Sequence, residues 1–203
     1  NKTVLELSRD TYSEFAGNIY QSPIAEPVVG EGRSFVRGSG RQFDVIQMTG
    51  VVTWAGLSSG AYVLSENYVY TVEAFRDLLS HLKDDGILAV SRFRLAPPRE
   101  TLRVVSIAYQ ALKDVGAPDP SNNIVVMSLN PTLAMVLTKI SPFTVNEIEL
   151  LKSVVVEADG IIFYAPGVKT NTAYADLIVA FTEDRETEFF DEYEYNVAPV
   201  YDD

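Results

Sequence analysis

The sequence predicts an α/β domain built around a mostly parallel sheet. Short apolar runs of strand length alternate with amphipathic runs of helix length, as in parallel strands joined by helical crossovers. The runs FDVIQM and GILAVSRF are almost continuously apolar, which is typical of strands buried on both faces. Two strand-like runs joined by Asn130-Pro131-Thr132 predict a C-terminal antiparallel hairpin.

Residues 4–93 alternate between these two patterns. Gly17-Asn18 is a left-handed stop signal after the first helix, and Gly38-Ser39-Gly40 ends the second. Apolar residues at steps of three and four mark the third helix, which we expect to end at Asp84-Asp85-Gly86. The predicted strands are 4–8, 27–29, 43–48 and 86–93, and the predicted helices are 9–16, 32–36 and 69–83.

The second half of the chain continues the alternation. Pro97-Pro98 precedes a helix that Gly116 closes. The predicted elements are helix 100–115, hairpin strands 123–129 and 133–140, helix 143–158, strand 160–165 and helix 172–181. The tail from residue 182 is acidic and aromatic, so we divide the chain into a domain at 1–181 and an extension at 182–203.

The composition excludes several classes of protein. The chain has 203 residues, 47% hydrophobic and 22% charged, enough for one buried core. Its net charge of −12 disfavours a nucleic-acid partner because phosphates would be repelled. Without cysteine it forms no disulfide, thiolate nucleophile or cysteine zinc site. No apolar run reaches the roughly 18 residues that span a bilayer, so we expect a soluble, cytoplasmic protein.

The long connection at residues 49–68 is a candidate lid or binding wall. It is rich in Gly, Ser and Thr, and connections of this length in a compact domain usually have a function. Trp54 is a lid candidate within it. Tyr62, Tyr68 and Tyr70 either line an amine site, since aromatic faces attract cations, or form half-buried walls.

Several segments resemble a known family. VVGEGRSFV, RQFDVIQM, LSENYVYTVEAFRDLLSHLKDDGILAVSRF and the tail NVAPVYDD are similar to bacterial spermidine synthase-like (polyamine aminopropyltransferase-like) domains, which have the class I S-adenosylmethionine-dependent methyltransferase fold. The resemblance covers most of the first 95 residues and, weakly, the tail. It implies a Rossmann-like methyltransferase sheet. Such domains are often parts of larger membrane-anchored proteins, so it also implies a fragment of a longer bacterial protein at the membrane face.

The resemblance implies a set of ligand-binding residues. Glu6 matches the acidic residue that holds the ribose hydroxyls, because a carboxylate accepts two hydrogen bonds from a vicinal diol. Glu31 matches the acidic residue placed against the adenine amino group, with Gly32 beside the base. Gln47, near the end of a strand, is either a further ligand contact or a buried, hydrogen-bonded side chain, and Thr49 after it is another candidate contact. The implied ligand is S-adenosylmethionine or its decarboxylated form, used as a substrate, with no metal.

Two departures from the family pattern change these expectations. The strand that carries the glycine-rich loop of the fold is absent, so we expect weak cofactor binding and exposed sheet edges that favour a homodimer or strand exchange. The two catalytic acids of the family fall on Thr49 and Val52, neither of which is a general base at neutral pH. We therefore do not expect polyamine synthesis by the usual mechanism.

Other ionisable residues are candidates for the missing role or have structural explanations. Glu66 either receives the proton of an amine or simply favours the positive end of the following helix. His81 has no second histidine or acid pair near it in the sequence, so we expect a structural role. Asp202 and Asp203 are adjacent terminal carboxylates, which we expect to be solvated and not to bind a metal.

Three hypotheses about function follow. The first is a transferase that uses S-adenosylmethionine or its decarboxylated form, with a polyamine as a candidate acceptor. The second is a non-catalytic adenosine-ligand sensor or interaction domain of a membrane-associated protein. The third is a structural module. Thr49 and Val52 favour the second over a strict spermidine synthase, while Glu31 and the long connection argue against the third.

Overall fold

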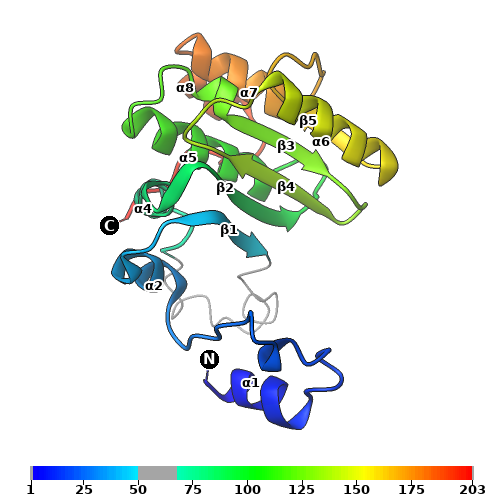
Figure 1. Cartoon of the computed structure of the whole chain (residues 1–203). Coiled ribbons are helices and arrows are strands. Elements are labelled where there is room, and N and C mark those ends of the chain that lie inside the picture. The colour runs from blue at the N-terminus through cyan, green and yellow to red at the C-terminus, as the bar shows by residue number, and fades with distance from the viewer. Residues whose placement is uncertain (1, 50–67, 203) are drawn as a thin grey trace.

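The computed structural model describes residues 2–49 and 68–202, and its strands form one mixed sheet (Figure 1). The strand order is β1-β2-β4-β3-β5. β1 and β2 are parallel, whereas β4 runs antiparallel to both β2 and β3, and β5 antiparallel to β3. Hence β1, β2 and β3 share one direction. The strands are β1 Phe43–Thr49, β2 Leu82–Phe93, β3 Ile124–Ser128, β4 Leu133–Thr138 and β5 Ile161–Tyr164.

Helices cover both faces of this sheet. The main ones are α2 Gly32–Ser39, α4 Val72–Ser80, α5 Glu100–Asp114, α6 Val145–Glu157, α7 Ala173–Thr182 and α8 Glu186–Glu192. Near the N-terminus, α1 (Lys2–Glu6) runs into a π-helical turn (Leu7–Thr11), and short 3-10 turns lie at Ile19–Gln21 and Pro120–Asn123. No helix in the described ranges is long and apolar enough to cross a membrane.

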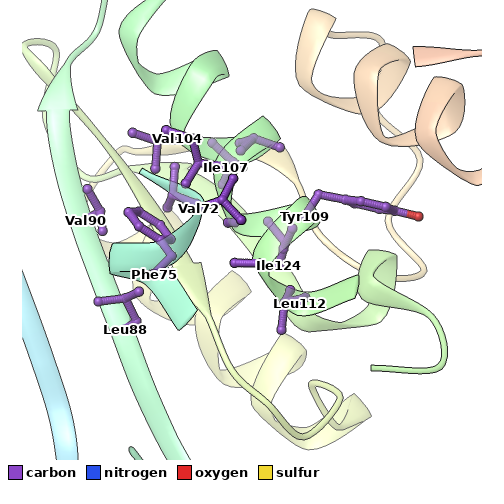
Figure 2. Packing of buried hydrophobic residues seen from close by; sticks show 14 of the residues in the cluster. Val72, Phe75, Leu88, Val90, Val104, Ile107, Tyr109, Leu112 and Ile124 are labelled. Atoms are coloured by element: carbon purple, nitrogen blue, oxygen red, sulfur yellow. The ribbon is translucent and has the colours of Figure 1, made fainter. Parts of the chain in front are cut away.

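Two apolar cores lie on opposite faces of the sheet because side chains alternate along each strand. On β2, Leu88 and Val90 belong to the larger core with α4, α5 and α7. Ala89, between them, belongs to the smaller core with α6. Figure 2 shows Phe75 of α4 packed near Leu88 and Val90, while Ile107 comes from α5. Each such fully buried side chain contributes roughly 1.5–3 kcal/mol.

Most expected elements are present. The α/β class is confirmed, and the expected C-terminal hairpin is β3-β4. The three helices expected in this half are also confirmed, as α5 for 100–115, α6 for 143–158 and α7 for 172–181. The helix expected at 69–83 is shorter, because β2 already begins at Leu82. Gly86 therefore does not end that helix. It lies inside β2, where a Cβ would be 2.8 Å from the Phe43 carbonyl oxygen, so it permits the close β1-β2 approach.

Two predicted strands are wrong. Residues 4–8 form part of α1 and the π-helical turn, and residues 27–29 are not in a strand. Residues 2–31 contain no buried side chain, and α1 lies well away from the sheet in Figure 1. A strand without a neighbour leaves its backbone groups unpaired, whereas a helix pairs them internally. Gly17 and Asn18 do have the expected positive φ angles, although the helix before them ends at Thr11.

The prediction that β1 is buried on both faces is also wrong. Only Met48 is buried, and Val45 is 56% exposed. The reason is position, because β1 is the edge strand of the described sheet and pairs there with β2 alone. The C-terminal tail, in contrast, packs onto the main core. Val197 is fully buried there, and the Val72 amide donates to the Val200 carbonyl.

Candidate functional site

The carboxyl ends of β1 and β2 lie side by side and define the candidate crevice. Thr49, the last residue of β1, pairs in register with Ser91 of β2. Gln47 and Thr49 are both exposed, and the Gln47 amide donates to the Thr49 hydroxyl at 3.0 Å. Ligands of open α/β sheets bind outside the carboxyl ends of parallel strands. The structure therefore brings these two predicted residues together at the expected edge.

Glu31 caps the N-terminus of α2. Its carboxylate accepts hydrogen bonds from the backbone amides of Arg33, at 2.9 Å, and Ser34, at 2.7 Å. Burial acts to raise the pKa of Glu31, but these bonds outweigh it and the pKa is lowered. Glu31 is therefore ionised and engaged at neutral pH. Beside it, a Cβ on Gly32 would meet nothing within 4 Å, so that backbone is open to an approaching molecule.

Glu6 occupies a different setting from the expected one. It is the last residue of α1 and lies 3.7 Å from the Lys2 ammonium one turn earlier. The position expected for it, at the end of a strand, is wrong because the apolar run before it is helical. Its proposed contact with ribose stays a prediction.

The Tyr70 ring is already in contact with a positively charged side chain of this protein, that of Arg92. The Arg92 guanidinium lies over the Tyr70 ring, 4.8 Å from the ring centroid, and its Nη1 donates to the Tyr70 hydroxyl at 3.4 Å. Arg92 Nη2 is also 2.6 Å from Glu100 Oε2, and these side chains are 17% and 30% exposed. Burial raises the pKa of Tyr70. The ring face that would attract an amine is thus already covered by a guanidinium.

The Arg33 side chain connects α2 to three other segments of the chain: α4, the C-terminal tail and the residues before α4. Its Nε donates to Asp77 of α4 at 2.7 Å, and its Nη1 lies 2.8 Å from the Asp202 carboxylate. The same Nη1 donates to the Tyr68 carbonyl at 3.0 Å. Because Arg33 follows Glu31 and Gly32 directly, it fixes the start of α2 against α4 and the C-terminal tail.

Asp202 is a structural residue, so its predicted solvation is wrong. The Thr71 hydroxyl donates to Asp202 at 2.7 Å, and Thr71 is only 4% exposed. Burial acts to raise the pKa of Asp202, but the bonds from Thr71 and Arg33 lower it. The described residues hold no group of three metal-type ligands. Asp203 lies outside the described residues.

The other predicted residues divide into two groups. His81 ends α4, where its Nδ1 lies 2.8 Å from the Asp77 carbonyl, in the structural role expected of it. Tyr68 is 42% exposed. Val52, Trp54, Tyr62 and Glu66 all fall outside the described residues. Sequence reasoning missed Arg33 and Arg92, although GEGR and RFR place them directly after the predicted ligand residues and at a strand end.

Comparisons with known proteins give structural matches only. No protein-family model matches the sequence, and no curated protein matches it. The fold is similar to a spermidine synthase solved with the transition state analogue AdoDATO, at 15% identity and a TM-score of 0.45. It is likewise similar to the spermidine synthase from Thermotoga maritima, at 14% identity and a TM-score of 0.46. The matches cover 93% of this chain but 57% and 58% of those chains.

Proposed function

We propose that this chain is a spermidine synthase-like domain that binds an adenosine-containing ligand, S-adenosylmethionine or its decarboxylated form. The observation that carries the proposal is the pair Gln47 and Thr49, exposed together where the parallel strands β1 and β2 end. The open backbone at Gly32, beside the ionised Glu31, supports it. A purine presents donors and acceptors that suit such amide, hydroxyl and carboxylate groups.

The same geometry favours ligand binding without the usual aminopropyl transfer. Deprotonating an amine requires a general base, such as an unpaired carboxylate, within hydrogen-bond reach. In the described part of the crevice edge, Gln47 and Thr49 are neutral, Glu31 is used as a helix cap, and Glu100 is paired with Arg92. The alternative is an active transferase whose base is Glu66. A polyamine acceptor, a homodimer, a membrane-anchored parent protein and a cytoplasmic location at the membrane face remain proposals of the same kind.

Calorimetry tests the binding. The chain is titrated with S-adenosylmethionine, decarboxylated S-adenosylmethionine and methylthioadenosine. We expect at least one of them to bind, and the double substitution Gln47→Ala and Thr49→Val to weaken it about tenfold. Lys152→Gln, on α6, is the matched control and should leave affinity unchanged. Failure of all three ligands to bind would refute the proposal.

Turnover separates the two forms of the proposal. Incubation with decarboxylated S-adenosylmethionine and putrescine should give no methylthioadenosine above the uncatalysed rate. If methylthioadenosine forms, and if the Glu66→Gln variant no longer forms it, the chain is an active transferase and the proposal of binding without transfer is wrong.

A further inference from the structure

The turn between β2 and α5 concentrates positive charge in an acidic protein. Residues 92–103 contain four arginines and one glutamate, in a chain whose net charge is −12. We call Arg92, Arg94, Arg99 and Arg103 the arginine turn. Glu100, the one carboxylate of the segment, pairs with Arg92. Across the described residues, Arg94, Arg99 and Arg103 have contacts with rings and carbonyls but no ion pair. No carboxylate of the described residues forms an ion pair with these three guanidinium groups.

Aromatic rings hold two of these guanidinium groups in place. Arg94 lies over Phe163 of β5, at 5.3 Å from the ring centroid, and Arg99 lies over Tyr195 of the tail, at 5.0 Å. Both arginines are exposed. Cation–π attraction to a ring does not consume the hydrogen-bond donors of a guanidinium, so N–H groups remain that can donate to an oxyanion. Stacking also restricts the side chain in advance and reduces the entropy lost on binding.

Two contacts connect the ring under Arg94 to the first turn of α5, which Arg99 precedes. Phe163, under Arg94, lies 5.4 Å from the Tyr174 ring. The Tyr174 hydroxyl lies 2.5 Å from the Thr101 hydroxyl, in the first turn of α5. Burial raises the pKa of Tyr174, while the hydrogen bond with Thr101 and the charge of Arg94 act to lower it. Arg99 immediately precedes this turn, so both guanidinium groups flank the start of α5.

The start of α5 offers further donors. Arg99 is its N-cap residue and makes no side-chain hydrogen bond to the first-turn amides, which point toward the helix terminus. One turn later, Arg103 donates from Nη2 to the Asn196 carbonyl, while its buried Nε has no hydrogen-bond partner in the described structure. Buried donors are nearly always paired in proteins. The unpaired Nε is a second sign, independent of the exposed arginines, that an acceptor is missing here.

We propose that the arginine turn binds a small anion that carries a phosphate or carboxylate group. Both groups match the paired N–H donors of a guanidinium. A small anion is favoured over a nucleic acid because the net charge of −12 repels a long polyanion. The site adjoins β2 but uses none of the residues proposed for the nucleoside, so it stands independently of the proposed function.

Calorimetric titration with two probes, inorganic phosphate and malonate, tests the site and distinguishes its ligand class. Sodium chloride at equal ionic strength is the reference. Saturable binding of phosphate alone assigns a phosphate ligand, and binding of malonate alone assigns a carboxylate. The double substitution Arg94→Gln and Arg99→Gln should raise the Kd of the bound probe at least tenfold. Lys113→Gln with Lys152→Gln removes the same charge elsewhere and should leave it unchanged.

Two outcomes would overturn the site. One is no binding of either probe beyond the chloride reference, and the other is an equal loss of affinity in both double variants. If the arginine variant does not fold, amide chemical shifts of the unsubstituted chain decide the question. Shifts confined to residues 92–103 on addition of the probe support the site, whereas scattered or absent shifts contradict it.

Discussion

Removing the Asp202 carboxylate should destabilise the protein through contacts that are far apart in the sequence. Asp202→Ala deletes the acceptor of the Thr71 hydroxyl, at 2.7 Å, and one carboxylate partner of Arg33, at 2.8 Å. Hydrogen bonds to charged groups contribute roughly 1.5–3 kcal/mol each. The Asp202 side chain is 29% exposed, and Arg33 keeps Asp77. We therefore expect a total loss of about 2 kcal/mol in the free energy of unfolding.

The effect should depend on pH with a defined sign. The folded-state pKa of Asp202 is lowered from 3.8, so its stabilisation is present above that value and is lost as pH falls through the folded pKa. Urea unfolding at pH 7 and below pH 3 measures this. Asp84→Ala, at an exposed acid, is the matched control. A loss at pH 7 no greater than that of Asp84→Ala, or an undiminished loss at the lower pH, would refute the reasoning.

Three further substitutions test other parts of the fold by urea unfolding. Gly86→Ala should cost about 1–3 kcal/mol, since its Cβ would lie 2.8 Å from the Phe43 carbonyl oxygen, while Gly32→Ala, at an open position, should cost clearly less. Thr144→Ala removes the capping box of α6 and should cost about 1 kcal/mol; no measurable change would contradict the cap. The Lys139 side chain is 1% exposed and is paired with Glu147. Lys139→Ala should lower the free energy of unfolding by about 3 kcal/mol, and Lys139→Met, which keeps the packing of the side-chain carbons, by much less. Equal losses in the two variants would contradict a dominant packing role for those carbons.

The second half of the chain could be predicted because its signals are local. Gly116 has the positive φ of a helix stop and follows α5 closely. Thr144 and Glu147 form the capping box of α6 within four residues of each other. Asn130 accepts from the amides of Thr132 and Leu133 and shapes the hairpin turn. Each of these signals acts between neighbours, so the sequence contains both partners.

The first half was predicted less well because its apolar runs are short. Val4-Leu5-Glu6-Leu7 fits a helix or a strand equally, and the choice depends on whether a neighbouring strand is present. β1 was recognised as a strand, but its burial depended on its place at the sheet edge. In the candidate crevice, Gln47 and Thr49 were predicted as ligand contacts near a strand end, and the structure shows them exposed and hydrogen-bonded to each other there.

By itself the sequence determined the acidic charge, the alternation of strands and helices, the hairpin and the family it resembles. Tertiary structure alone decided which strand lies at the edge and which charges are neutralised. Arg33 and Asp202 are 169 positions apart, yet they form an ion pair, whereas Arg94 and Arg99 have no ion pair with any carboxylate in the described part of the chain. Electrostatic pairing depends on distances of a few ångströms, and the folded chain sets those distances independently of separation in sequence.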